Sequence, residues 1–297
     1  MEDTALIGLL YESGEWSDYK LAAELSQEGC AVRMVDMAHL NAEEVLSAIK
    51  PCSMLVSRVF ASALFRNHAR AHANMELVCA GADKMGIAMV NKARAHSFEI
   101  DKRHATSVLA DGGIDVPRVQ AYGFPSELSV WFAAGCAHYP CIIKPNCGGR
   151  TTYTSVAHTP DEALSFLKSI APIELIVEDY LKAEHGFITR IELIEGACVL
   201  AVKRSVVEGG LSAYRLGSTY ELYDDCPRDT TEAARKAGEL LDIAYGSFDI
   251  IEREGKAYVI DANSVSNVSP DNTEMFGLDL MKEYAVALAS RLRSLTD

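Results

Sequence analysis

Short apolar runs alternate with helical patterns through the first third of the chain, and this alternation constrains the fold more than any other feature. The segment TALIGLL predicts a strand, and the residues from Trp16 to Glu28 repeat apolar side chains at helical spacing until Gly29. The apolar runs AVRMV, SMLVSRV and IAMV follow, and a helical pattern separates each from the next. This βαβαβαβ order predicts a parallel sheet with helices on both faces.

Parallel sheets bind ligands beyond the carboxyl ends of their strands, which makes Ser57, Arg58 and Asn91 candidate wall residues. A solvated loop charge is an equally good interpretation of Arg58. No G-x-G-x-x-G sequence follows any of these strands, so a dinucleotide-dependent dehydrogenase is disfavoured. The basic stretch 66–72 (RNHARAH) spreads over more than one helix face, which favours a solvated helix surface over a site.

Length and charge narrow the class of protein. With 297 residues, 49% hydrophobic and 24% charged, the chain is globular and long enough for two or three subdomains that share a site. The formal charge of −14 disfavours a nucleic-acid partner, which needs a basic face. No apolar run approaches the roughly 18 residues of a membrane span. The acidic N-terminus does not resemble an export signal either, so we expect a cytoplasmic protein without membrane contact.

The eight cysteines are scattered, with no C-x-x-C pair, and indicate reduced, mostly buried thiols rather than disulfides or zinc.

The remaining two thirds of the chain predict two mixed α+β units. A helix over 98–109 opens the first, and the strands YPCIIKP, TTYTSVA and IELIVEDYL follow it. The second contains the paired strands FITRIELIEG and ACVLAVKR, a helix from Thr231, a hairpin and a last helix from Leu278. We therefore predict three units, which are residues 1–95, 96–181 and 182–297.

The hairpin sequence YGSFDIIEREGKAYVIDAN is the most informative segment for chemistry. If its turn centres on Gly255, Asp249 and Asp261 lie directly opposite each other, with Asn263 on the same face. Like charges in this position are unfavourable, and a divalent cation removes the conflict because Mg²⁺ takes carboxylate and carboxamide oxygens. The alternative is an ordinary two-faced hairpin, since a one-residue slip would turn both Asp side chains into water.

A second charged segment, YPCIIKPNCGGRTTYT, suits a polyphosphate. Lys144 ends a buried strand, and Gly148 and Gly149 allow backbone N–H groups to point at an anion. The loop is not a Walker loop, and a plain turn would also use two glycines. Cys147 is better interpreted as a small filler in this loop than as a nucleophile.

Two further segments have ordinary alternatives. Glu178 and Asp179 end the apolar run LIVED, which is also typical of a strand that leaves the core. Lys102 could equally be an exposed helix lysine.

Taken in order, these segments resemble the ATP-grasp superfamily. Within it they are similar to the carboxylate–amine ligases related to ribosomal-protein glutamate ligases and to the amino-group-carrier ligases of lysine biosynthesis. The likeness covers most of the chain and rests on the ordered set DK, GIDVP, IIKP…GG, VEDYL, R-x-E-L…VKR and FDII…YVIDAN. It implies an ATP-grasp fold, α/β and α+β, in which a parallel-sheet domain precedes the ATP-grasp part.

The resemblance also implies an ADP-forming C–N ligase that uses ATP and one or two Mg²⁺ ions, with Mn²⁺ as a substitute. Its substrates would be small-molecule or peptide carboxylates and amines. The sequence does not give the oligomeric state, and a homodimer or homotetramer is our expectation only because symmetric assemblies of this kind are common. Carried over residue by residue, the ATP contacts are two phosphate-binding lysines, two glycines of a closing loop and an adenine hinge: Lys102, Lys144, Gly148, Gly149, Glu178, Asp179, Tyr180 and Leu181. The implied metal ligands are Asp249, Asp261 and Asn263, and the implied catalytic residues are Arg204 and Arg190.

The sequence departs from this family mainly where substrates would bind. Ile188 replaces an Asp that contacts ribose, and Glu184 is the substitute we expect. Ala213-Tyr214-Arg215 stands where the family has R-x-N, and Ser264 to Asn267 replaces S-P-G. Arg58 and Arg215 are the candidate substrate contacts.

The implied mechanism transfers the γ-phosphoryl group of ATP to a carboxylate, and an amine then displaces phosphate. A non-catalytic nucleotide-binding regulator, or a phosphotransferase with a non-carboxylate acceptor, are the alternatives.

Overall fold

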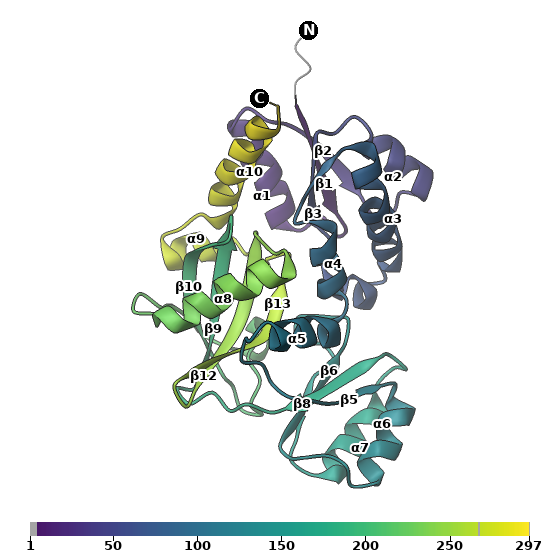
Figure 1. Ribbon diagram of the computed structural model, residues 1–297, viewed down its shortest axis with the longest axis vertical. Coiled ribbons are helices and arrows are strands. Elements are labelled where there is room, and N and C mark those ends of the chain that lie inside the picture. Colours follow the sequence, from purple (N-terminus) through teal and green to yellow (C-terminus); the bar gives the residue numbers. More distant parts are fainter. Residues whose placement is uncertain (1–4, 267, 297) are drawn as a thin grey trace.

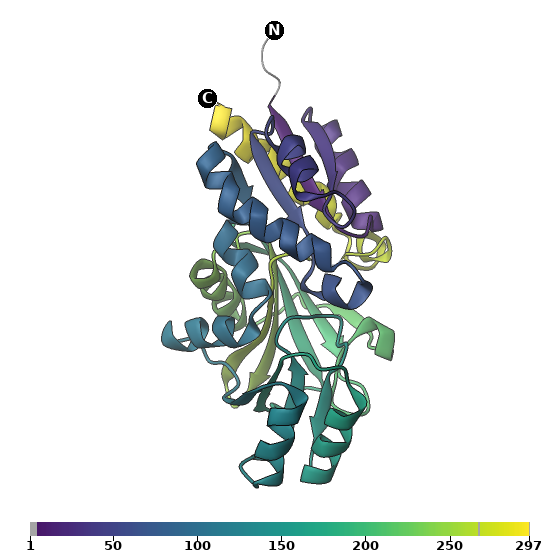
Figure 2. The same ribbon diagram turned by 90° about the vertical axis from the view of Figure 1, so that its right-hand side faces the viewer.

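The computed structural model describes residues 5–266 and 268–296. These residues form three sheets along the long axis of the molecule. The N-terminal sheet lies at one end, the sheet of the central unit at the other, and the C-terminal sheet between them (Figures 1 and 2). None of the described helices is long and apolar enough to cross a membrane.

The N-terminal sheet is parallel, as the alternating pattern predicts, and has the strand order β2-β1-β3-β4. Its strands are β1 (Leu6–Tyr11), β2 (Ala31–Asp36), β3 (Met54–Arg58) and β4 (Ala88–Val90). Helices α2 (Ala42–Ile49) and α3 (Ala69–Met85) pack on one face. The other face is covered by α1 (Trp16–Gln27) and by α10 (Leu280–Thr296), which returns from the far end of the chain (Figure 1).

The basic stretch 66–72 does not form a solvated helix surface, so that expectation is wrong. A 3₁₀ helix (Ala61–Arg66) interrupts the chain before α3 and turns the stretch toward the protein. Arg66 forms ion pairs with Glu12 and Glu15. His72 is buried and stacks on His96 with ring centroids 6.0 Å apart. Long-range packing, which helical spacing does not report, decides the outcome here.

The helix expected over 98–109 is two helices, α4 (Ala93–Glu99) and α5 (Lys102–Asp111). Asp101 separates them and caps α5 by accepting a hydrogen bond from the His104 N–H. Apolar residues of both helices share a core with the C-terminal sheet and α8 (Arg228–Leu241). The boundaries at residues 95 and 181 stay predictions. Helix α4 spans residue 95, and α4 and α5 pack against the C-terminal sheet, whereas α10 packs against the N-terminal sheet.

The central sheet has the order β5-β8-β6-β7 and is antiparallel. Its strands are β5 (Val119–Gly123), β6 (Cys141–Pro145), β7 (Ser155–Ala157) and β8 (Leu175–Asp179). Helices α6 (Pro125–Ala133) and α7 (Pro160–Ser169) bury one face of this sheet. The strand expected over TTYTSVA is shorter than predicted because Thr151 and Tyr153 have positive φ angles of 58° and 52° and form a turn.

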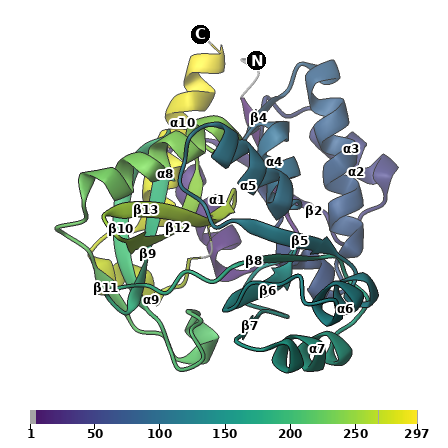
Figure 3. The same cartoon turned by 60° about the horizontal axis from the view of Figure 1, so that its bottom comes forward.

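The C-terminal sheet is antiparallel in the order β11-β10-β9-β12-β13. Its strands are β9 (Phe187–Ile194), β10 (Ala197–Ser205), β11 (Tyr220–Leu222), β12 (Gly246–Arg253) and β13 (Lys256–Asn263). Helix α8 packs on one face, where Ile191, Phe248 and Val259 are buried. Figure 3 shows this sheet beside the central sheet, with α8 and the α6–α7 pair on their respective outer faces. The opposite faces of the two sheets carry the candidate site.

Candidate functional site

The β12–β13 hairpin places Asp249 opposite Asp261, and Ser247 opposite Asn263, as the sequence predicts. The turn itself is tighter than expected, because Arg253 pairs with Lys256 and Ile250 with Val259. Continued unchanged, that register would put Asp249 opposite Ile260. A β-bulge between Asp249 and Ile250 shifts the pairing by one residue and brings the two carboxylates together.

Pairing across four strands arranges the site residues in two rows on the face opposite α8. Strand residues two apart share a face, so the pairings of β10, β9, β12 and β13 can be followed from strand to strand. The first row is Val202, Arg190, Asp249 and Asp261, and the second is Leu200, Glu192, Ser247 and Asn263. The metal-ligating candidates therefore lie at one edge of the sheet and apolar side chains at the other, with Arg190 and Glu192 between them.

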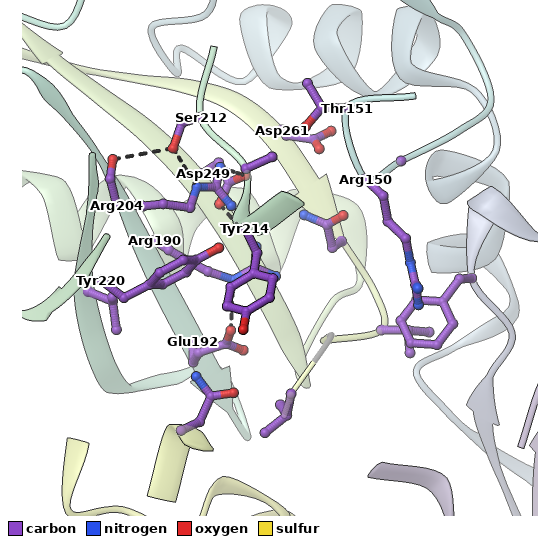
Figure 4. Close-up of a pocket in the computed structure, with 18 of the residues that line it drawn as sticks. Arg150, Thr151, Arg190, Glu192, Arg204, Ser212, Tyr214, Tyr220, Asp249 and Asp261 are labelled. Carbon is purple, nitrogen blue, oxygen red and sulfur yellow. Dashed lines mark hydrogen bonds and ion pairs between the residues drawn. The ribbon is translucent and has the colours of Figure 1, made fainter. Parts of the chain in front are cut away.

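Two arginines neutralise the buried carboxylate of Asp249. Arg204 Nη2 lies 2.7 Å from its Oδ2, and Arg190 Nη1 lies 3.4 Å from its Oδ1. Burial would raise the pKa of Asp249, but the charges of Arg204 and Arg190 outweigh burial and hold it below its ordinary value. The two guanidinium groups therefore stabilise the ionised form of Asp249. Figure 4 shows the two guanidinium groups converging on it from β10 and β9.

Lys102 pairs with the other carboxylate, Asp261. It is the first residue of α5, and its backbone N–H donates to the Asn146 carbonyl at 3.1 Å, which fixes the helix start beside the glycine loop. Burial would lower the pKa of Lys102, but Asp261 and Glu99 raise it above its ordinary value. The exposed-lysine interpretation of Lys102 is therefore wrong.

Lys144 projects from the central sheet into the same region. Its ammonium lies 2.7 Å from the carboxylate of Glu178 and donates to the carbonyl of Ile260 on β13 at 3.0 Å. The second oxygen of Glu178, Oε1, is buried and accepts no hydrogen bond from the described residues. An uncompensated buried acceptor of this kind is suited to a ligand's donor.

The glycine loop is folded against the N-terminal domain and the segment after β10. A Cβ atom on Gly148 would lie 2.5 Å from Cε2 of Phe65, so a larger residue there would have to displace the Phe65 ring. Arg150 forms an ion pair with Glu15, and Arg215 donates to the Arg150 carbonyl at 2.9 Å. These contacts hold the loop over the carboxylates of the hairpin.

Two adjoining cavities occupy the space between the two sheets. The first, about 130 Å³, is lined by Lys102, Lys144 and the segment Glu178–Leu181. The second, about 320 Å³, extends over β9 and β10 to α9 (Asp271–Phe276) and includes Arg190, Asn263 and Arg215. The residues common to both are the loop and the charged centre: Gly148, Gly149, Arg150, Thr151, Arg204, Ser212, Asp249 and Asp261.

Several predicted residues lie outside these two cavities. Arg58 is buried with its Nε 2.9 Å from the Oδ1 of Asp18, and it also donates to Ser17 and to the Ser266 carbonyl. It therefore joins the N-terminal domain to the segment after β13 and is not the substrate contact we expected. Glu184 is exposed and accepts a hydrogen bond from the Glu254 N–H, so the structure brings it to neither cavity.

The predicted wall residues of the parallel sheet are also structural. The Asn91 side chain bonds backbone groups of Ala244, Tyr245 and Ser264 and fastens the N-terminal domain to the C-terminal sheet. Ser57 contacts Met75. Of the segment expected to replace S-P-G, Ser264 to Ser266 are described and Asn267 lies outside the described residues.

Within the hinge segment, two groups already have partners. The Asp179 carboxylate pairs with Arg118, and the Tyr180 N–H donates to the Pro140 carbonyl at 3.1 Å. The Leu181 N–H has no backbone partner among the described residues.

Sequence reasoning missed Glu192, which lines the larger cavity beside Arg190. The signal was available, because Glu192 follows Arg190 by two residues on a predicted strand and therefore shares its face. The Ser212 hydroxyl, which accepts from Arg204 Nε at 2.9 Å, lies in an irregular loop and left no pattern to detect.

A RimK-like ATP-grasp domain matches residues 99–288 of the 297-residue chain. The chain belongs to the RimK-like ATP-grasp family. The matched segment includes the glycine loop, the hinge, both rows of the C-terminal sheet and most of α10. The ATP-grasp fold expected from the resemblance is confirmed.

Curated relatives of this RimK-like ATP-grasp chain are named as ligases. A probable alpha-L-glutamate ligase of Desulfotalea psychrophila is 26% identical over 186 residues, which cover 61% of this chain and 39% of that protein. A D-alanine–D-alanine ligase of Pediococcus pentosaceus is 26% identical over 144 residues, which cover 44% and 40%. The chain thus spans about two fifths of the length of these two relatives.

Solved structures of ATP-grasp proteins superpose on nearly the whole chain. A RimK-domain ATP-grasp protein of Sphaerobacter thermophilus gives a TM-score of 0.70 at 19% identity and covers 95% of this chain and 98% of its own. A D-cycloserine synthetase gives 0.70 at 16% identity, with 97% and 100% covered. At these identities the superpositions establish the fold.

Proposed function

We propose that this chain is an ATP- and Mg²⁺-dependent ligase that activates a carboxylate as an acyl phosphate and joins it to an amine. The observation that carries the proposal is the meeting of two cavities on one charged centre, formed by Asp249, Asp261, Arg204 and the glycine loop. A nucleotide in one cavity and a carboxylate in the other would present their reacting atoms to each other there. The ligase names of the relatives support the same reaction class.

The smaller cavity suits the nucleotide. The Leu181 N–H and the buried Glu178 Oε1 offer one donor and one acceptor to a base, and both lie where the hinge was predicted. Lys144, 2.7 Å from the other oxygen of Glu178, and Lys102 also line this cavity and would bind the phosphates. Both lysines are now paired with carboxylates, and a polyphosphate offers them an alternative partner.

The donor set at the edge of the C-terminal sheet fits magnesium. Asp249, Asp261 and Asn263 provide oxygen ligands from paired strands, and the Asn263 side chain makes no hydrogen bond to the described residues. When bound there, Mg²⁺ supplies charge that offsets the phosphate oxygens during transfer. Among the described residues no three His, Cys, Asp or Glu side chains cluster as a metal site.

The chemistry needs positioning and charge more than a protein nucleophile. A carboxylate oxygen of the substrate attacks the γ-phosphorus, and the bond to ADP breaks. Nη1 of Arg204 has no hydrogen-bond acceptor among the described residues and faces this centre, so it is available to the carboxylate or the transferring group. A neutral amine then attacks the carbonyl carbon of the acyl phosphate, phosphate leaves, and the nitrogen loses a proton. The closed glycine loop excludes water, which would otherwise hydrolyse the acyl phosphate.

Hydroxylamine distinguishes this reaction from its alternatives. It attacks an acyl phosphate to give a hydroxamate, whereas a phosphotransferase with a non-carboxylate acceptor gives none and a nucleotide-binding regulator releases no ADP. We expect ATP, Mg²⁺ and a pool of amino acids with hydroxylamine to yield equal amounts of ADP and hydroxamate. ADP without hydroxamate would assign the chain to the phosphotransferases.

Two substitutions test the residue roles. Asp261→Asn keeps the side-chain volume and should abolish Mg²⁺-dependent ADP release, and Asp225→Asn, at an exposed carboxylate, should leave it unchanged. Lys144→Ala should weaken ATP binding in a direct titration. Near-normal ADP release by Asp261→Asn, or an unchanged titration for Lys144→Ala, would remove the respective assignment. Cytoplasmic location and a homodimer or homotetramer stay predictions.

A further inference from the structure

The larger cavity contains a region that phosphoryl transfer does not use. The metal-ligating candidates occupy β12 and β13, whereas the floor of the cavity continues across β9 and β10 to α9. Along this floor the residue types change from acidic, through the pair Arg190 and Glu192, to apolar. This order of acidic, basic and apolar side chains indicates which groups a ligand needs along its length.

The far end of the floor is apolar. Leu200 and Val202 of β10 form a buried cluster with Phe276 of α9, and Leu278 packs against it. Leu200, Val202, Phe276 and Leu278 all line the cavity. A charged side chain placed against these four residues would lose its water, so this end favours an apolar group.

Glu192 lies in the middle of the floor and retains unused acceptor capacity. One oxygen accepts from Arg190 Nε at 2.9 Å, and the other accepts from the Ser266 hydroxyl. A carboxylate offers about four acceptor sites, so about two have no partner among the described residues. Burial raises the pKa of Glu192 and the charge of Arg190 lowers it, with burial the larger effect. A ligand cation on Glu192 would offset this cost of burying the carboxylate.

Arg190 cannot satisfy Glu192 alone, because it also neutralises Asp249. Its Nη1 contacts Asp249, and its Nη2 donates to the Ser247 hydroxyl. Glu99, which also lines the cavity, accepts hydrogen bonds from the backbone N–H groups of Ala61 and Ser264 and has no ion-pair partner among the described residues. Glu192 therefore still offers acceptor positions to one positive group of a ligand.

We infer that this cavity binds a free α-amino acid with an apolar side chain. Its carboxylate would lie toward Arg204 and the Asp249–Asp261 edge, its ammonium on Glu192, and its side chain over Leu200, Val202 and Phe276. The inference rests on the proposed function, because it identifies the carboxylate to be activated. A cavity of about 320 Å³ is at the lower end for small-molecule sites, which suits one amino acid rather than a long peptide.

Binding is tested first without turnover, by calorimetry in the presence of Mg²⁺ and a non-hydrolysable ATP analogue. We expect leucine or phenylalanine to bind at least about tenfold more tightly than glutamate or lysine, since the apolar end penalises a charged side chain. Leucine should also bind more tightly than isocaproate, which has the same skeleton without the amine. Tighter binding of glutamate, or no binding of any amino acid, would overturn the inference.

Glu192→Gln tests the ammonium contact. The substitution should reduce the affinity for leucine by about tenfold to a hundredfold and leave the affinity for isocaproate almost unchanged. The preference for the ligand with an amine would then disappear. An equal loss for both ligands would show that Glu192 only supports Arg190 and would remove its assigned role. Glu221→Gln, an exposed acid on β11, serves as the matched control and should preserve both affinities.

Leu200→Ala tests the apolar end without changing Glu192, in case Glu192→Gln does not fold. The added space should shift the preference from leucine toward phenylalanine by roughly tenfold. An unchanged ratio would exclude this end as the side-chain site. If hydroxamate formed only from glutamate or aspartate, this inference would be overturned and the ligase proposal would stand. If apolar amino acids bound but no hydroxamate formed, the ligase proposal would fail and the binding site would stand.

Discussion

Gly246 lies outside both cavities but packs against the strand end that carries the candidate magnesium ligand Asn263. It begins β12 and pairs with Leu193 of β9, and a Cβ atom there would lie 2.2 Å from the backbone oxygen of Asn263 and 2.8 Å from Cγ2 of Ile243. Contacts below 3.0 Å are essentially never observed for a real Cβ. In Gly246→Ala the end of β13 must therefore move away by roughly 1 Å. A misplacement of this size can slow an enzyme.

The end of β13 cannot yield freely. The Ser264 N–H donates to Glu99, and the Ser264 carbonyl accepts from the Asn91 side chain at 2.9 Å. A shift of Asn263 strains these bonds, so we expect Gly246→Ala to reduce the free energy of unfolding by about 1–3 kcal/mol, as overpacked cores do. Because Asn263 is a candidate magnesium ligand, ADP release at fixed Mg²⁺ should fall about a hundredfold.

Magnesium titration of ADP release, urea unfolding and a magnesium-free ATP titration separate the two effects. We expect a higher half-saturating Mg²⁺ concentration and nearly normal ATP binding, because neither Gly246 nor Asn263 lines the cavity proposed for the nucleotide. Gly81→Ala is the control, since its Cβ would meet only Met85 at 3.5 Å and Leu46 at 4.0 Å. It should be about 0.4–1 kcal/mol more stable and titrate normally. Unchanged stability and magnesium dependence in Gly246→Ala would refute this reasoning.

Three other perturbations address the supporting structure. Burial lowers the pKa of His96 from 6.5 to about 4, so the unfolded chain binds this proton more readily. The free energy of unfolding should therefore reach its highest value above about pH 6.5 and decrease by about 3 kcal/mol as the pH falls toward 4. In urea titrations, His96→Gln should lose less stability over the same pH range. Glu15→Gln releases Arg150 of the glycine loop and should raise the ATP concentration for half-maximal ADP release about two- to fivefold; no change would mean that Glu15 does not hold the loop. Arg58→Met leaves Asp18 buried without its cation and should cost about 3–5 kcal/mol in urea, whereas a substrate-affinity change at normal stability would contradict its structural role.

The parts of the fold with a local signal could be predicted from the sequence. Apolar runs between helical patterns marked the strands of the parallel sheet, and the hairpin was recognisable from its alternation around Gly255. The pairing of Asp249 with Asp261 was predicted correctly, but from a regular hairpin centred on Gly255, which the structure does not have. The turn is two residues long, and the bulge after Asp249 restores the expected register. A bulge of this kind depends on how β9 and β13 hold β12 from both sides, and alternation within one strand does not report it.

The partners of the charged residues could not be predicted, because they come from distant segments. Arg58 and Asp18 meet across two elements of the N-terminal domain, and Lys102 reaches Asp261 from a separate helix. Sequence spacing gives the face on which a side chain lies but not the element packed against that face. Resemblance to a family compensated for this at the nucleotide side, where Lys144 and Glu178 do line one cavity. It misdirected us at Glu184, where the family's pattern is absent.

The sequence raised a charge conflict in the hairpin and offered a metal ion as its solution, and the structure shows that basic side chains of the chain itself also offset the two carboxylates. Arg190 and Arg204 neutralise Asp249, and Lys102 neutralises Asp261. Under the proposed function, Lys102 would exchange Asp261 for a phosphate when that carboxylate binds Mg²⁺. Phosphate then compensates the lysine and magnesium compensates the carboxylate, so neither exchange leaves a buried charge alone. Nucleotide and metal should for this reason bind more tightly together than separately, and the centre would be assembled only when both are present.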